Sequence, residues 1–160
     1  MGNTAEFELI KTLLEKNATV STAESCTGGM VAARLTSVSG ASGAFKYGAV
    51  TYCNEAKHIM LGVSTETLDE HGAISAETAK EVAEGIRKAM NADIGLSVTG
   101  NAGPGAAENK PVGLVYIGVS SKNYSTVLKN NFEGNRTSVR EQAADSALLL
   151  ALSAAEKLGD

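Results

Sequence analysis

The chain contains the segment Gly40-Ala-Ser-Gly-Ala-Phe-Lys-Tyr-Gly-Ala-Val-Thr-Tyr-Cys-Asn-Glu-Ala-Lys57, around which its other elements can be arranged. Small residues around Ser42 predict a tight turn, and residues 47–53 predict a strand. A helix is expected from Asn54, with Lys57 in its first turn. A hydroxyl on a tight turn and an amine at a helix start are the two groups that a serine/lysine hydrolase needs. We therefore take Ser42 as the candidate nucleophile and Lys57 as its candidate base.

The composition is typical of one globular domain, predicted to span residues 1–160. The chain has 160 residues, of which 43% are hydrophobic and 20% charged, enough to form a substantial core without disulfides. Two cysteines, Cys26 and Cys53, and two histidines, His58 and His71, form no ligand cluster in the sequence. We therefore expect no structural zinc site, no disulfide framework and no bound metal or cofactor.

Charge and hydropathy indicate which partners to expect. No apolar run approaches the ~20 residues of a membrane span, and the first residues are acidic where a signal peptide would be basic. The net charge is −4, with basic residues scattered, and the aromatic residues are four tyrosines and three phenylalanines. Nucleic-acid binding needs clustered cations or stacking aromatics. We expect a cytoplasmic protein that binds neither membranes nor nucleic acid.

Hydrophobic periodicity and capping residues predict the elements in alternation. Apolar residues at helical spacing, together with capping serines and glycine stops, predict helices over 4–16, 30–36, 54–61, 64–68, 75–90 and 137–158. Runs rich in β-branched residues predict strands over 19–23, 47–53, 93–99, 112–120 and 125–132. Because helices alternate with strands except at one hairpin, the expected fold is a three-layer α/β/α sandwich with a mixed, mostly parallel five-stranded sheet.

Three loops rich in Gly, Ser and Thr follow or precede the predicted strands, at residues 24–29, 40–43 and 99–105. Ligands of such sheets bind where loops leave the strand ends, so we expect the three loops to converge. In the first of them, a strand, a glycine turn and a helix start follow one another. The unpaired backbone N–H groups of such a helix start can bind an anion.

Several motifs, in the same order along the chain, resemble the CinA C-terminal domain family. They are Thr22-Ala-Glu-Ser-Cys-Thr-Gly-Gly29, Tyr52-Cys-Asn-Glu-Ala-Lys57, His71-Gly-Ala-Ile-Ser75, Thr99-Gly-Asn-Ala-Gly-Pro-Gly105, Lys110-Pro-Val-Gly113 and Gly134-Asn-Arg136. The resemblance covers nearly the whole chain. The family's characterised members are nicotinamide mononucleotide deamidases.

The resemblance implies an activity and a set of site residues. It implies an α/β/α fold and metal-independent hydrolysis of the carboxamide of nicotinamide mononucleotide, giving nicotinate mononucleotide and ammonia. The family's nucleophile falls on Ser42, its general base on Lys57, and the tyrosine of its catalytic motif on Tyr52. Substrate-binding positions fall on Glu24, Ser25, Cys26, Thr99, Gly100 and Arg136. The resemblance also suggests a homodimer. Longer members of the family carry an extra N-terminal domain that resembles molybdopterin-binding proteins, and we expect this domain to be absent here.

A lysine can act as a base only when neutral, so the pKa of Lys57 must fall far below its reference value of about 10.4. With Asn54 as N-cap, Lys57 would be the third helical residue, where the helix dipole opposes a positive charge. That effect is worth roughly one pKa unit, so burial or a nearby Arg136 must contribute the rest. Glu55 would oppose the change, but adjacent helix positions point about 100° apart, and we expect it to face away.

Each site residue also has a plainer interpretation. Ser42 could be an ordinary turn residue, Lys57 a solvated helix residue, and Tyr52 a packing residue. Cys26 is the alternative nucleophile, although a small buried residue is its simpler interpretation. At the level of the protein, the alternatives to an amidohydrolase are a catalytically silent nucleotide-binding or regulatory module and an interaction protein linked to competence or DNA damage.

Overall fold

Five runs of β-forming residues build the sheet of the computed structural model, which describes residues 3–160. The strands are β1 (Val20–Glu24), β2 (Phe45–Val50), β3 (Ile94–Gly100), β4 (Leu114–Ser120) and β5 (Ser125–Asn131), in the spatial order β2-β1-β3-β4-β5. Strand β1 pairs in parallel with β2 and β3, whereas β4 pairs antiparallel with β3 and β5. The mixed, mostly parallel five-stranded sheet is as predicted, because β1, β2, β3 and β5 run in one direction and β4 alone runs in the opposite one.

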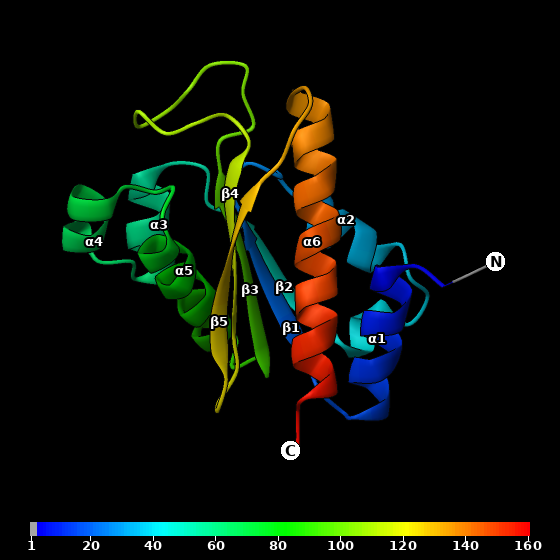
Figure 1. Cartoon of the computed structure of the whole chain (residues 1–160). Helices are drawn as coiled ribbons and strands as arrows, with labels where there is room; N and C mark the ends of the chain where they lie inside the picture. Colours follow the sequence, from blue (N-terminus) through cyan, green and yellow to red (C-terminus); the bar gives the residue numbers. More distant parts are fainter. Residues whose placement is uncertain (1–2) are drawn as a thin grey trace.

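Helices cover both faces of the sheet, which gives the predicted three layers (Figure 1). One face carries α1 (Ala5–Glu15), α2 (Met30–Thr36) and α6 (Arg136–Glu156), and the other carries α3 (Asn54–Leu61), α4 (Thr65–His71) and α5 (Ala76–Ala89). A single 3₁₀ turn, η1 (Ala41–Gly43), precedes β2. Every predicted helix and strand forms, with ends that differ by a few residues.

The larger of the two clusters of buried apolar residues lies on the face covered by α1, α2 and α6. The alanine-rich α6 packs against it with small residues such as Ala143, Ala147 and Ala151, and α1 contributes Leu9 and Leu13. Small side chains allow a helix to lie close to its neighbours, which favours the tight contact of α6 with the sheet and with α1. The smaller cluster lies under α3, α4 and α5.

The starts of α4 and α5 follow the capping rules, and the start of α3 does so with a shift of one residue. Ser64 and Ser75 accept hydrogen bonds from the backbone N–H groups of Thr67 and Thr78, as predicted for N-caps. The N-cap of α3 is Cys53 and not Asn54, because the Cys53 thiol accepts from the N–H of Ala56 at 3.4 Å. Lys57 is therefore the fourth helical residue, at the end of the first turn.

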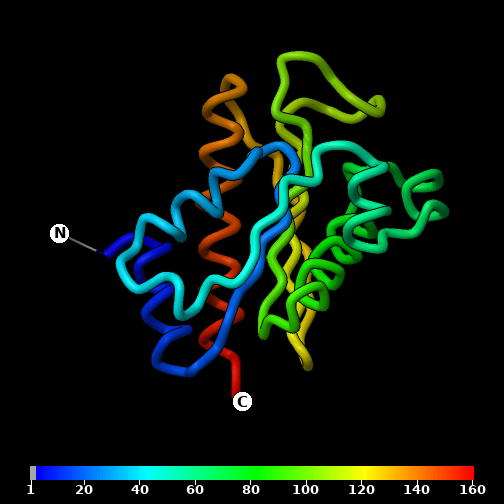
Figure 2. The backbone as a smooth tube through the Cα atoms, turned by 180° about the vertical axis from the view of Figure 1, so that it is seen from behind, coloured from blue at the N-terminus to red at the C-terminus, as the bar shows by residue number. Residues whose placement is uncertain are grey.

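The sheet has two ends, and its parallel strands decide which loops meet. Strands β1, β2 and β3 run in the same direction, so the segments that follow them, at 25–29, 51–54 and 101–105, lie at one end. The 40–43 turn precedes β2 and lies at the other end, as the tube in Figure 2 shows. A six-residue strand is about 17 Å long, so the predicted convergence of all three loops is wrong for 40–43.

Glu24, which the resemblance placed among the substrate-binding residues, has a structural role at the end of β1. Its side chain is buried, and its two carboxylate oxygens accept from the N–H groups of Val31 at 2.8 Å and Ala32 at 3.1 Å. These N–H groups belong to the first turn of α2 and have no partner within the helix. The carboxylate thus joins the end of β1 to the start of α2.

Replacing Glu24 with Gln should lower the free energy of unfolding by about 1–3 kcal/mol, because the new NH₂ group faces a backbone N–H and leaves a buried donor unpaired. Urea unfolding of Glu24→Gln and of the exposed control Glu133→Gln measures the difference. The control should change stability by less than about 0.5 kcal/mol. An equally small change for Glu24→Gln would show that the carboxylate does not stabilise the start of α2.

Candidate functional site

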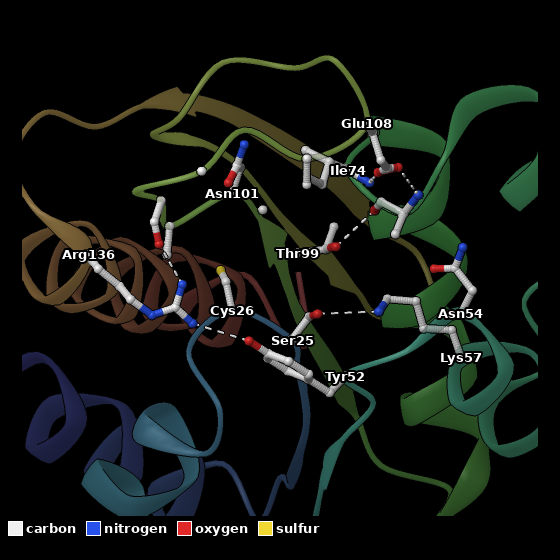
Figure 3. Close-up of a pocket in the computed structure, with 16 residues that line it drawn as sticks. Ser25, Cys26, Tyr52, Asn54, Lys57, Ile74, Thr99, Asn101, Glu108 and Arg136 are labelled. Carbon is white, nitrogen blue, oxygen red and sulfur yellow. Dashed lines mark hydrogen bonds between the residues drawn. The ribbon is translucent and has the colours of Figure 1, made fainter.

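A pocket of about 390 Å³ opens at the end of the sheet where β1, β2 and β3 finish (Figure 3). Its walls come from the turn after β1, the start of α3, the α4–α5 connection, the segment 99–108 and the start of α6. Pockets of this size hold small molecules, including mononucleotides. The pocket therefore lies where the predicted ligand site of an open α/β sheet should be.

Lys57 reaches into this pocket from α3 and meets a serine. Its side chain is only 1% exposed, and Nζ lies 2.7 Å from the carbonyl oxygen of Thr51 and 3.3 Å from the hydroxyl oxygen of Ser25. Figure 3 shows the amine and the hydroxyl pointing toward one another from α3 and from the turn after β1. The structure thus pairs a buried lysine amine with a serine hydroxyl.

Burial lowers the pKa of Lys57, because removing the ammonium from water disfavours the charged form. Cys53, Glu108 and Cys26 act in the opposite direction on the Lys57 pKa, each more weakly than burial. Glu55, predicted to face away from Lys57, is exposed and is not among the groups that shift the Lys57 pKa. A lowered pKa is what a lysine base requires.

The structure does not bring Ser42 to Lys57. Ser42 is an exposed residue of η1 and lines a separate hollow with residues such as Thr36 and Phe45. The predicted pairing of Ser42 with Lys57 is wrong, because β2 lies between the two residues and carries the chain from one end of the sheet to the other. Ser25, which the resemblance placed among the binding residues, is the serine beside the lysine.

Ser25 follows β1 directly, on a turn that the backbone and one arginine hold in place. Its N–H donates to the carbonyl of Val98 at 2.9 Å, and its carbonyl accepts from the N–H of Gly28 at 3.0 Å. Gly28 and Gly29 have φ angles of 58° and 109°, which glycine adopts without the strain of a side chain. The turn then continues into α2.

Arg140 of α6 anchors this turn, and nothing in the sequence predicts it. Its Nε donates to the carbonyl of Cys26 at 2.9 Å, and Nη2 donates to the carbonyl of Thr27 at 3.2 Å. The two partners are more than a hundred residues away in the chain. Arg140 thus holds the segment immediately after Ser25 without entering the pocket.

Cys26 lines the pocket beside Ser25, but its thiol is a poor nucleophile. Burial raises the pKa of the Cys26 thiol to about 11, while Arg140 and Arg136 offset part of that rise. At neutral pH the group is a thiol, and the thiolate is the reactive form of cysteine. The structure therefore favours Ser25 over Cys26 as the nucleophile of this pocket.

Tyr52 and Arg136 form the rim of the pocket. Arg136 donates from Nη1 to the carbonyl of Gly103 at 2.6 Å and from Nη2 to the hydroxyl of Tyr52 at 3.2 Å. Tyr52 is 61% exposed, so its ring lines the part of the pocket that is open to solvent. The guanidinium places positive charge at the mouth, away from Lys57.

The opposite wall comes from the end of β3 and the loop that follows it. Thr99, Gly100 and Asn101 line the pocket, and the Thr99 hydroxyl donates to the carbonyl of Ala73 at 2.8 Å. A side chain on Gly100 would lie 2.7 Å from the carbonyl oxygen of Leu114, so the close approach of β4 requires glycine there. Thr99 and Gly100 are therefore in the pocket, as the resemblance implied.

Two charged residues, to which the sequence analysis assigned no role, tie this loop to the α4–α5 connection. The Glu108 carboxylate accepts from the N–H groups of Ala73 at 2.9 Å and Ile74 at 2.8 Å. The Lys110 ammonium donates to the carbonyls of His71 and Ile74, both at 2.6 Å. These bonds close the wall of the pocket around residues 71–74.

Two negative findings apply to residues 3–160. No group of three or more His, Cys, Asp and Glu side chains in this range could hold a metal ion. No helix in the same range is long and apolar enough to cross a membrane. The polar groups that this pocket brings together include the Ser25 hydroxyl, the buried Lys57 amine and the Arg136 guanidinium at the rim.

Known proteins share this sequence and fold. The CinA C-terminal domain family matches residues 3–155. A CinA-like protein of Endomicrobium trichonymphae is 51% identical over 137 residues, 85% of this chain and 32% of that protein. A CinA-like protein of Acidobacterium capsulatum is 47% identical over 148 residues, 92% of this chain and 36% of that protein. The chain thus spans about a third of the length of these curated relatives.

The fold is also that of a solved relative. The crystal structure of a competence-damaged protein (CinA) superfamily protein from Klebsiella pneumoniae 700603 superposes with a TM-score of 0.91 at 30% identity, covering 95% of this chain and 96% of that one. Sequence and structure agree over nearly all of residues 3–155. The chain belongs to the CinA C-terminal domain family.

Proposed function

We propose that this domain hydrolyses the carboxamide of nicotinamide mononucleotide to nicotinate mononucleotide and ammonia, with Ser25 as nucleophile and Lys57 as general base. The observation that carries the proposal is the 3.3 Å contact between the Lys57 amine and the Ser25 hydroxyl inside a pocket that lowers the lysine pKa. The resemblance to nicotinamide mononucleotide deamidases supports the choice of substrate.

In the first half of the reaction, the Ser25 oxygen attacks the carboxamide carbon while its proton moves to the neutral amine of Lys57. The π electrons of the carbonyl bond move onto its oxygen, which becomes an oxyanion. The C–N bond then breaks, and the leaving nitrogen takes the proton from Lys57 and departs as ammonia. An ester of the nicotinate group on Ser25 remains.

In the second half, Lys57 removes a proton from a water molecule that attacks the ester carbon. The bond between that carbon and the Ser25 oxygen breaks, and the serine regains a proton from Lys57. The sum is amide plus water giving carboxylic acid plus ammonia. The Thr51 carbonyl, 2.7 Å from Nζ, orients the amine through both halves.

The oxyanion needs a hydrogen-bond donor close to the nucleophile, and we assign this role to the backbone N–H of Cys26. This N–H directly follows Ser25 and donates to no other backbone group of the described chain. Arg140 binds the Cys26 carbonyl and so holds the peptide group that directly follows the one carrying this N–H. A donor fixed before the reaction costs no reorganisation in the transition state.

Arg136 at the rim suits the phosphate of the nucleotide. A guanidinium binds phosphate oxygens with two parallel N–H groups, and its bonds to Gly103 and Tyr52 keep it at the mouth of the pocket. The ribose and the nicotinamide ring of the substrate would then extend from the rim toward Ser25. Tyr52, by its exposure and its bond to Arg136, contributes to binding at the rim in this arrangement.

Ser25→Ala should abolish ammonia release from nicotinamide mononucleotide, with kcat falling about 10³-fold or more, because the nucleophile is lost. Ser42→Ala is the matched control, and it should retain nearly full activity because Ser42 lies at the other end of the sheet. A coupled ammonia assay on both purified variants makes the comparison. The reverse result, an active Ser25→Ala and an inactive Ser42→Ala, would contradict the assignment.

The activity should rise with pH along a limb whose midpoint lies below the ordinary lysine pKa of about 10.4, because only the neutral amine of Lys57 is a base. Lys57→Arg keeps a positive charge but cannot deprotonate, so its kcat should be as low as that of Lys57→Met. Profiles of kcat against pH measure the midpoint. Substantial kcat in Lys57→Arg would show that the group acts through its charge.

The same pKa shift predicts a pH-dependent stability. Between the lowered folded pKa and the unfolded value of about 10.4, the unfolded chain binds one more proton at Lys57, so the free energy of unfolding should rise with pH in this window. Below the folded pKa that contribution is constant. Urea unfolding should show this slope in the native protein and its loss in Lys57→Met; parallel slopes would mean that Lys57 is not perturbed by burial.

A further inference from the structure

One wall of the pocket presents hydrogen-bond acceptors in a fixed orientation. Asn101 lines the pocket and is 5% exposed, and its Nδ2 donates to the carbonyl oxygen of Lys110 at 3.2 Å. A carbonyl oxygen can only accept, so the amide nitrogen must be on that side. The Oδ1 atom then lies on the other side of the group, and Figure 3 shows it turned toward the part of the pocket where Cys26 and Ser25 lie.

The carbonyl that orients Asn101 is itself held in place. Lys110 donates from its N–H to the carbonyl of Ala107 at 3.0 Å and from its ammonium to the carbonyls of His71 and Ile74. Lys110 is thus anchored by three hydrogen bonds to two parts of the chain. Rotation of the Asn101 amide by 180° would place two acceptor oxygens against each other, so the observed orientation is the stable one.

Thr99 presents a second acceptor on the same wall. Its buried hydroxyl has a single hydrogen, which donates to the carbonyl of Ala73 at 2.8 Å, so only lone pairs remain for the pocket. In an extended chain, residues two apart point to the same face, and Gly100 between them has no side chain. The Thr99 hydroxyl and the Oδ1 atom of Asn101 therefore each offer an acceptor to a ligand beside Ser25 and Lys57.

We infer that Asn101 and Thr99 accept hydrogen bonds from the NH₂ group of a carboxamide. The site therefore binds the amide more tightly than the corresponding carboxylate. This inference rests on the proposed function and adds how the site distinguishes substrate from product. An amide nitrogen has two hydrogens for two acceptors. A carboxylate has no hydrogen at neutral pH, so its charged oxygens would face the lone pairs of both groups.

The arrangement also favours turnover. The leaving nitrogen remains bonded to acceptors as it becomes ammonia, and the acid formed by hydrolysis faces the unfavourable wall. Unpaired or repelled polar groups in a buried site weaken binding by about tenfold or more. Selection against the product therefore limits inhibition by the accumulating acid.

Binding measured in the Ser25→Ala background tests the inference, because that variant holds the amide without hydrolysing it. Isothermal titration with nicotinamide mononucleotide and with nicotinate mononucleotide gives the ratio of the two affinities. We expect the Ser25→Ala protein to bind the amide about tenfold or more tightly than the acid. Adding Asn101→Ala should weaken amide binding about tenfold and leave acid binding unchanged or tighter.

Two further variants separate recognition from support of the loop. Asn131→Ala, an exposed asparagine on β5, is the matched control and should leave both affinities unchanged. Asn101→Ser keeps a small polar group whose hydroxyl can donate or accept, so it should bind the acid more tightly than its parent. If circular dichroism shows that Asn101→Ala lowers the folded fraction, Asn101→Ser replaces it in the binding comparison.

The outcomes are distinct. An equal loss of amide and acid affinity in both Asn101 variants would overturn the inference, because it would show a structural role. Equal binding of the two nucleotides by Ser25→Ala would also overturn it, while the proposed reaction would still stand. Failure of Ser25→Ala to bind either nucleotide would overturn the inference together with the proposed substrate.

Discussion

The burial of one lysine amine is the constraint on which the site depends. An ammonium loses much of its hydration when it is buried, so the fold can place Lys57 at 1% exposure only by supplying partners or by lowering its pKa. It does both. The Thr51 carbonyl and the Ser25 hydroxyl face the amine, and burial lowers the pKa of Lys57. The residues around Lys57 exclude water from its amine and hold the amine in contact with the Ser25 hydroxyl.

The direction of the strands supplies the contact. Because β1 pairs in parallel with both β2 and β3, the three segments that follow these strands share one end of the sheet. Ser25 follows β1, the start of α3 follows β2, and Thr99 ends β3. Sheet pairing brings them together although 32 residues separate Ser25 from Lys57. The antiparallel strands β4 and β5 add width to the sheet, and the β3–β4 connection contributes the remaining wall.

Charged side chains hold this end of the molecule by bonding to backbone groups. Glu24 binds the start of α2, Arg140 the turn after Ser25, and Glu108 and Lys110 the α4–α5 connection. Each satisfies N–H or carbonyl groups that loops and helix ends leave unpaired. A site made of loops thereby gains the rigidity that precise contacts with a substrate require.

The sequence by itself determined the local elements, because helix periodicity, β-branched runs and capping residues such as Ser64 and Ser75 act over a few residues. It also identified Lys57, Thr99 and Arg136 as pocket residues through the resemblance. Only the tertiary structure decided which serine meets Lys57, since Ser42 is closer to Lys57 along the chain but at the opposite end of the sheet. The roles of Arg140, Glu108 and Lys110 could not be predicted from the sequence, because their partners lie tens of residues or more away. Side-chain chemistry is local, whereas the pairing of distant groups depends on strand order and direction.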